Sequence, residues 1–236
     1  MDKIKILACV GSYNPNNNKH YEVYRKVIDG FNSCRKDAEI DIVFADNISH
    51  QESRDYLLSV QKQIPGIYLD FINGKRYSVW QSYNHAVGLM KDRGYNYIIY
   101  CNSDVYIDNC ETIKNLILDY KENIDAGCIS PQINYDYCWK FPEHLGLNGT
   151  QATPLKINQC MNAHFDMFSS DFLDKFNYKR IDILPSPCTE PFVPILTASI
   201  GMRQYASHRA DVIHEARHYI SPLGMEREEF SKYGVI

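Results

Sequence analysis

Residues 97–105 read Tyr-Ile-Ile-Tyr-Cys-Asn-Ser-Asp-Val, an apolar run that passes directly into a short polar turn. A near-continuous apolar run is typical of a parallel strand that is buried on both faces. The turn Asn102-Ser103-Asp104 would then lie at the carboxyl end of that strand, where open α/β sheets bind their ligands. A carboxylate there can hold a divalent cation that bridges two phosphates. Asn-Ser-Asp is also an ordinary turn and N-cap sequence, so the role of Asp104 depends on its context.

Strand-like and helix-like segments alternate on both sides of this stretch. Apolar runs and alternation predict strands over 3–10, 39–45, 66–71, 96–101 and 126–130. Helical spacing of apolar residues predicts helices over 19–34, 50–62, 78–93 (with Gly94 as the residue that ends it) and 109–122. This order predicts an α/β fold with a mostly parallel sheet, helices on both faces, and strand ends along one edge.

The pattern weakens after Pro131. Residues 135–157 read as a long loop with one short strand near 137–141, and connections of this length are uncommon unless they are functional. Order returns in the last third of the chain, where we predict strands over 160–168 and 210–214 and helices over 171–176 and 190–205. No segment reads as a linker, so we predict a single domain over residues 1–236.

The composition excludes several classes of protein. The 236 residues carry a net charge of −4, which lacks the basic surface of a nucleic-acid-binding protein. The eight cysteines form no C-x-x-C pair, so a zinc ribbon or redox dithiol is not expected. No apolar run approaches the ~20 residues that span a bilayer, and the N-terminus reads as a strand instead of a signal peptide. We therefore expect a cytoplasmic protein without a transmembrane segment and leave peripheral membrane attachment open.

Three further polar segments accompany the turn at residues 102–104. They are Gly11-Ser12-Tyr13-Asn14 after the first strand, Asp46-Asn47 after the second, and Ser82-Tyr83-Asn84-His85-Ala86 within a helix. In order and spacing, the four segments resemble the P-T-Y-N, D-D/D-N, A-R-N-x-A and D-x-D motifs of family 2-like GT-A nucleotide-sugar glycosyltransferases. The resemblance covers about residues 3–130, and 160–218 more weakly. It implies a Rossmann-like GT-A sheet with a small antiparallel acceptor-side part. Residues 1–130 would bind the nucleotide sugar, and residues 131–236 would supply the acceptor and catalytic side.

The resemblance also implies which residues bind the sugar donor. These positions are Ser12, Tyr13, Asp46, Arg76 (by its charge alone), Ser78, Ser82, Asn84, Asn102, Ser103 and Asp104. Asp104 matches the metal-binding carboxylate of D-x-D, so a divalent metal, Mn²⁺ or Mg²⁺, is expected there. The sequence departs from the motifs at three places: Asn102 replaces an acidic residue, Tyr83 replaces an arginine, and Gly11-Ser12 replaces the early P-T of P-T-Y-N. For three positions a structural role stays open: Tyr13 as a packing aromatic, Asp46 as a helix or turn cap, and Asn84 as a core amide satisfied by the backbone.

The second half must supply a base, because inverting sugar transfer needs a group that takes the proton of the attacking hydroxyl. Glu190 lies at the distance from D-x-D at which the resemblance places this base, although a glutamate in a first helical turn also suits the helix dipole. Asp166 is the alternative base. His164 is a candidate acceptor contact, and His214 is a candidate metal ligand or a surface histidine.

These expectations combine into a metal-dependent glycosyltransferase. It would move a sugar from a nucleotide-diphosphate sugar, with inversion, to a hydroxyl of a glycan, glycoprotein or lipid-linked acceptor. One alternative is a non-catalytic glycan- or nucleotide-binding module on the same scaffold, which Asn102 favours. The other is a sugar-phosphate nucleotidyltransferase, which needs a glycine-rich loop after the first strand that Gly11-Ser12-Tyr13-Asn14 does not provide.

Overall fold

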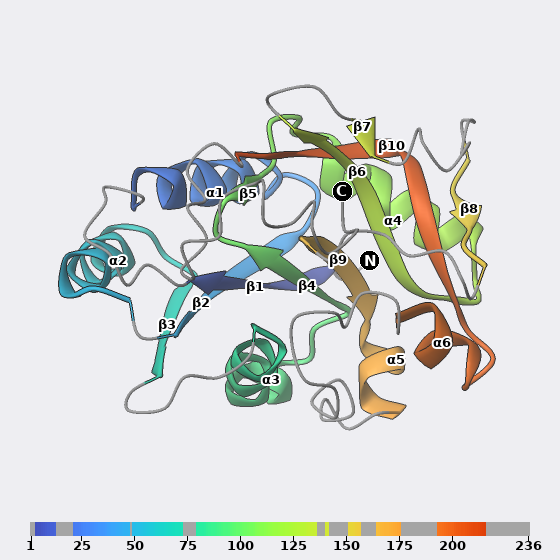
Figure 1. Ribbon diagram of the computed structural model, residues 1–236, viewed down its shortest axis with the longest axis horizontal. Coiled ribbons are helices and arrows are strands. Elements are labelled where there is room, and N and C mark those ends of the chain that lie inside the picture. Colours follow the sequence, from blue (N-terminus) through green and yellow to red (C-terminus); the bar gives the residue numbers. More distant parts are fainter. Residues whose placement is uncertain are drawn as a thin grey trace, which may run out of the picture.

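One curled sheet forms the centre of the protein. The computed structural model describes residues 3–12, 21–47, 49–72, 79–135, 140–141, 151–156, 164–175 and 193–215. Within these residues the strand order is β3-β2-β1-β4-β9-β6-β10-β5, with β7 beside β6 and β8 beside β10 (Figure 1).

The first half of the chain builds a parallel block. The strands β3 (Ile67–Ile72), β2 (Glu39–Asn47), β1 (Lys5–Ser12) and β4 (Tyr97–Asn102) pair in parallel in this order. Successive residues of β1 face opposite sides, so Ala8 packs in one hydrophobic core and Cys9 in the other. Burial on both faces explains why β1 and β4 read as continuous apolar runs instead of alternating ones.

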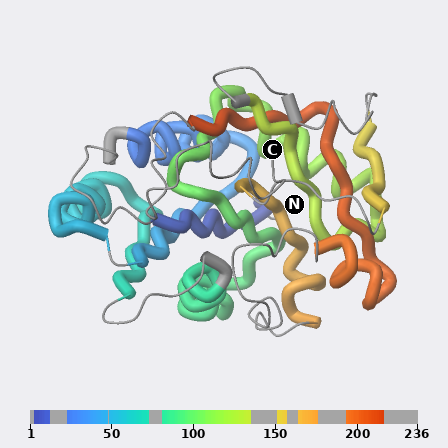
Figure 2. Tube along the Cα trace, viewed as in Figure 1, coloured from blue at the N-terminus to red at the C-terminus, as the bar shows by residue number. Residues whose placement is uncertain are grey.

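The second half adds the antiparallel part that the sequence predicted. The strand β9 (Phe165–Ser169) runs antiparallel between β4 and β6 (Ala126–Tyr135), and β10 (Arg203–His214) runs parallel to β6. The short strands are β5 (Val105–Tyr106), β7 (Lys140–Phe141) and β8 (Thr153–Pro154). The trace in Figure 2 shows β9, which comes late in the sequence, inserted beside the earlier strand β4.

Helices cover both faces of the sheet. On one face lie α1 (Tyr21–Ser33), α2 (Gln51–Gln63) and α4 (Thr112–Glu122), and on the other lie α3 (Val79–Met90), α5 (Ser170–Lys175) and α6 (Val193–Ala198) (Figure 1). The turn η1 (Lys91–Arg93) ends at Gly94, whose left-handed φ of 73° confirms its predicted role. None of the helices in the described ranges is long and apolar enough to cross a bilayer.

The predicted elements of residues 1–130 agree with the structure to within three residues at each end, except that β6 extends to Tyr135. The helix predicted over 190–205 is wrong. In the described part of that range, α6 ends at Ala198, Gly201 adopts a left-handed φ of 75°, and β10 begins at Arg203. The strand predicted over 210–214 is therefore only the last part of a longer strand that pairs with β6 from residue 203.

Gly30 gives the first testable prediction, because α1 crosses β5 so closely that a Cβ atom at Gly30 would lie 2.5 Å from the carbonyl oxygen of Ile107. We expect Gly30→Ala to lower the free energy of unfolding by about 2 kcal/mol, although alanine favours helices. Gly88 of α3 has no atom within 4 Å of that position, so Gly88→Ala should stabilise by about 0.5–1 kcal/mol. Urea unfolding of both variants measures the change in the free energy of unfolding. Equal effects of the two substitutions would contradict the packing of α1 on β5.

Candidate active site

Asp104 and His214 form a buried pair at the carboxyl end of β4. The chain leaves β4 at Asn102, turns, and enters β5, which pairs antiparallel with the end of β10 so that His214 lies opposite Val105. His214 Nε2 is 3.0 Å from Asp104 Oδ2, and the backbone N–H of Glu215 donates to the carbonyl of Asp104 at 2.9 Å. The structure thus brings together the two residues that the sequence proposed as metal ligands.

The donor atoms of this pair suit a divalent metal. Asp104 is 8% exposed and His214 is 7% exposed, and the Oδ1 atom of Asp104 is buried with no hydrogen-bond partner among the described residues. Carboxylate oxygen and imidazole nitrogen are both ligands for Mn²⁺-like ions. No group of three or more His, Cys, Asp or Glu side chains within the described ranges could hold a metal. A metal on this pair would therefore also need ligands from outside it, and phosphate oxygens and water commonly supply them.

A second polar group lies beside this pair. Tyr83, which stacks on Tyr100 with ring centroids 4.9 Å apart, donates its hydroxyl to Asn102 Oδ1 at 2.8 Å. Asn102 Nδ2 lies 2.7 Å from His164 Nδ1, and the ring centroids of His164 and His214 are 4.3 Å apart. Burial, and then the neighbouring His214, lower the pKa of His164 to about 4, so its imidazole is neutral at pH 7. Tyr83 and Asn102, two of the departures from the motifs, are therefore in direct contact.

Asp46 is fully buried, and both of its carboxylate oxygens are engaged. Ser12 donates to Oδ2 at 3.0 Å, while Arg54 Nε at 2.7 Å and the backbone N–H of Ser49 at 3.2 Å donate to Oδ1. Arg54 also donates to the carbonyl of Ile72 at the end of β3. These contacts join the ends of β1, β2 and β3 to α2, and they include the turn cap that was the open alternative for Asp46.

The ion pair of Asp46 gives a second prediction. Arg54→Ala would leave the buried carboxylate without its cation, and we expect a loss of about 2 kcal/mol in the free energy of unfolding. This value is below that of a fully buried pair because the Arg54 side chain is 15% exposed. The pair Arg25–Asp29 is solvent-exposed, so Arg25→Ala is the matched control and should leave stability unchanged. Urea unfolding of the two variants distinguishes them, and equal stabilities would contradict the structural role of Arg54.

The candidate donor-binding residues of α3 are close to the same strand ends. Ser82 is buried, and Asn84 is nearly so and accepts a hydrogen bond from the Tyr100 hydroxyl through Oδ1 at 3.2 Å. The backbone N–H of Ser103 donates to the carbonyl of Gly11 at 3.1 Å, which fastens the turn after β4 to the end of β1. This partner of Asn84 is a side chain, so the alternative of a core amide satisfied by the backbone stays open.

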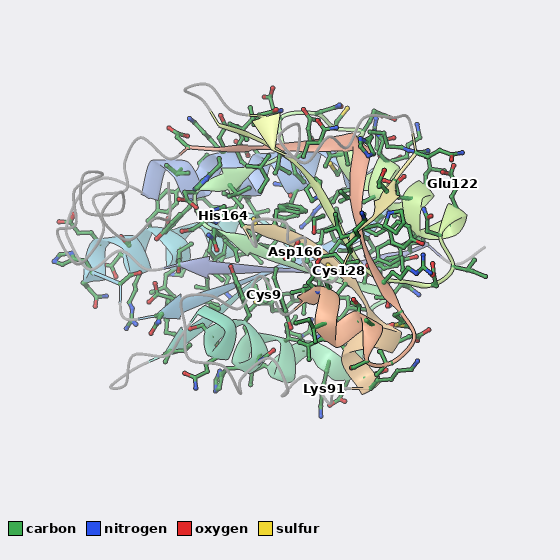
Figure 3. The ribbon with its side chains drawn as sticks, turned by 45° about the vertical axis from the view of Figure 1, so that its right-hand side comes forward. Cys9, Lys91, Glu122, Cys128, His164 and Asp166 are labelled. Carbon is green, nitrogen blue, oxygen red and sulfur yellow. The ribbon has the colours of Figure 1, made fainter. Side chains whose placement is uncertain are left out.

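Asp166, the alternative base, lies inside the protein on β9. It is 1% exposed and accepts a hydrogen bond from the hydroxyl of Ser130 on β6. Gln204 of β10 donates in turn to Ser130 at 3.0 Å, and Cys128 lies next to this group (Figure 3). Sequence reasoning missed Ser130 and Gln204, because neither stands in a recognisable motif and the partner of each is far away in the chain. The remaining candidates Tyr13, Arg76, Ser78 and Glu190 lie outside the described residues.

Comparison with known proteins identifies the fold. No protein-family model and no curated protein match the chain. Among solved structures, residues 1–349 of TarS from S. aureus give a TM-score of 0.66 at 13% identity, covering 90% of this chain and 61% of that one. The mannosyltransferase PcManGT from Pyrobaculum calidifontis, solved with GDP-Man and Mn²⁺, gives 0.61 at 12% identity, covering 92% and 59%. GalNAc-T7, solved with UDP, GalNAc and Mn²⁺, gives 0.65 at 12% identity, covering 91% and 44%.

These neighbours share their fold with this protein. The predicted GT-A fold, a curled and mostly parallel α/β sheet with an inserted antiparallel strand, is therefore confirmed. The chain spans about three-fifths of the first two of these neighbours, 61% and 59%.

Proposed function

We propose that this protein is a metal-dependent glycosyltransferase that moves a sugar, with inversion, from a nucleotide-diphosphate sugar to an acceptor hydroxyl. The observation that carries the proposal is the buried Asp104–His214 pair at the carboxyl end of β4 in a GT-A fold. Ligands in open α/β sheets bind at this edge. Support also comes from neighbours solved with GDP-Man and Mn²⁺, with UDP-GlcNAc, and with UDP, GalNAc and Mn²⁺.

Each side chain then has one task. Asp104 and His214 would hold Mn²⁺ or Mg²⁺, which when bound supplies positive charge to the leaving diphosphate. Glu190 would take the proton from the acceptor hydroxyl. At the same time the hydroxyl oxygen forms a bond to the sugar carbon C1, and the bond from C1 to the diphosphate breaks. Asp166 is the weaker candidate for this base, because its carboxylate is enclosed in the interior and holds Ser130.

The remaining assignments concern the two substrates. The sugar donor would lie over the ends of β1, β2 and β4 and over α3, with Tyr13, Arg76 and Ser78 among its contacts. Residues 1–130 would form this half of a single domain, and residues 131–236 would form the acceptor half. The acceptor would be a glycan, a glycoprotein or a lipid-linked sugar, and the reaction would take place in the cytoplasm or at a membrane surface.

A panel of sugar donors tests the proposal. The protein is mixed with Mn²⁺ and, in turn, with UDP-, GDP- and dTDP-sugars, and the melting temperature and the release of nucleoside diphosphate are measured. We expect one nucleotide class to raise the melting temperature and to be hydrolysed slowly in a Mn²⁺-dependent way. If no donor does either, the proposed function is wrong.

One observation favours a second candidate, a non-catalytic binding module on the same scaffold. Asn102 stands where the motif has an acidic residue, and its amide is engaged with Tyr83 and His164. The same panel separates the two functions. A donor that raises the melting temperature but is never turned over, even with glycan acceptors present, would support the binding module.

A further inference from the structure

A chain of hydrogen bonds leads from the interior to His164, whose ring lies beside that of His214. It begins at Tyr83 of α3, passes through Asn102 at the end of β4, and reaches His164 just before β9. The backbone N–H of Asn102 also donates to the carbonyl of His164 at 2.9 Å. Side chains and backbone together therefore fix the position of His164 relative to β4.

The direction of each bond along this chain determines where the proton of His164 lies. The hydroxyl of Tyr83 donates to Asn102 Oδ1, so the amide nitrogen of Asn102 faces His164. An amide N–H can only donate, and His164 Nδ1 must therefore accept. A neutral imidazole that accepts at one nitrogen carries its proton on the other. His164 is accordingly held with its N–H at Nε2, the ring atom remote from Asn102.

This N–H belongs to a ring that lies directly against the proposed diphosphate site. The ring centroids of His164 and His214 are 4.3 Å apart, and His214 contacts Asp104. We propose that His164 binds the sugar donor by donating a hydrogen bond from its Nε2–H to a diphosphate oxygen. Asn102 and Tyr83 are positioning residues that keep the imidazole proton on Nε2. The inference rests on the proposed function, and it assigns His164 to the donor instead of the acceptor contact expected from the sequence.

The assignment gives a physical reason for an asparagine at position 102. An aspartate there could accept from Tyr83 but could not donate to His164, so the imidazole proton would move to Nδ1 to meet it. His164 would then present a lone pair, instead of an N–H, to an anionic diphosphate. The neutral amide avoids this and also brings no second negative charge close to Asp104.

Two substitutions of His164 separate the two ends of the ring. In His164→Asn the amide ends near the place of Nδ1 and leaves the Nε2 position empty, whereas in His164→Gln the longer side chain returns an N–H₂ to it. With UDP and GDP as probes in the presence of Mn²⁺, calorimetry should show that His164→Asn weakens binding of the preferred nucleotide by about tenfold or more. His164→Gln should remain within about threefold of the wild type. His85→Asn, at a half-exposed histidine that pairs with Asp70, is the control and should leave binding unchanged.

The ¹⁵N NMR spectrum of His164 reports the tautomer without any activity assay. We expect the proton on Nε2 in the wild type and a mixture of tautomers in Tyr83→Phe, which frees the amide of Asn102 to turn. A wild-type proton on Nδ1 would overturn the positioning role of Asn102 and Tyr83. Equal binding by folded His164→Asn and the wild type would overturn the assignment of His164 alone. Failure of the wild type to bind any nucleoside diphosphate in the presence of Mn²⁺ would overturn the proposed function as well.

Discussion

Asp104→Asn is expected to lower kcat/KM for Mn²⁺-dependent turnover of the sugar donor by about 1,000-fold, or about 4 kcal/mol of transition-state stabilisation. Asparagine keeps the shape and one oxygen of the side chain but removes the negative charge that would bind a cation. The carboxylate oxygen Oδ1 of Asp104 is buried without a hydrogen-bond partner among the described residues, so it is the atom best placed to bind a cation. Steady-state kinetics at several Mn²⁺ concentrations, together with electron paramagnetic resonance of bound Mn²⁺, measure the effect.

The control for this variant is Asp108→Asn. Asp108 lies four residues after Asp104, just beyond β5, and is exposed, so its loss removes the same charge from the chain without touching the pair. We expect unchanged kinetics and unchanged Mn²⁺ binding for Asp108→Asn. If Asp104→Asn bound Mn²⁺ and turned over the donor as the wild type does, Asp104 would not be a metal ligand.

The parallel block could be predicted from sequence because its strands are buried on both faces. Leu7 and Ala8 are adjacent in β1 and pack in different cores, and the same holds for Ile98 and Ile99 in β4. In β1 and β4 the residues inside the strand therefore carry no charge, and the polar residues follow where the strand ends. The strands β2 and β3 differ, because they carry Asp41 and Asp70. The pattern in β4 is why Asp104 could be placed at the ligand edge of the sheet from the sequence alone.

The strand β10 could not be predicted in the same way, because its polar residues have partners far away in the chain. Gln204 is buried against Ser130, and Arg209 pairs with Asp119 and Glu122 of α4. A register shift between Ala206 and Asp211 further breaks the alternation by which a strand is recognised. Only the folded sheet shows which partners these side chains have, so the sequence favoured a helix over 190–205.

The contact between Tyr83 and Asn102 could likewise not be predicted from the sequence. Sequence comparison with the family motifs marked each residue as a separate departure, 19 positions apart. Nothing in that spacing indicates that the hydroxyl of one bonds to the amide of the other, since they lie on α3 and β4. Because α3 packs against the sheet, the side chains of Tyr83 and Asn102 meet and form a hydrogen bond between two uncharged groups.

Glu190→Gln is the second substitution for which we expect a large effect, a fall in kcat of about 1,000-fold. Glutamine has the size of glutamate but cannot take the proton of an acceptor hydroxyl at neutral pH. Binding of UDP or GDP should stay the same, because the base acts on the acceptor and not on the nucleotide. Transfer to an acceptor in single-turnover experiments, combined with calorimetry of nucleotide binding, separates the chemical step from the binding step.

The competing explanation is that Glu190, three residues before α6, only interacts favourably with a helix dipole. Glu52 lies in the first turn of α2, so Glu52→Gln is a control for the dipole effect alone. A slight loss of stability with full activity in both variants would exclude Glu190 as the base. The remaining candidate would be Asp166, for which Asp166→Asn tests the role directly. Asp166 is buried and accepts a hydrogen bond from Ser130, so Asp166→Asn should lower the stability of the protein whether or not it lowers activity. Of the two variants, only Glu190→Gln can lower kcat while leaving stability nearly unchanged.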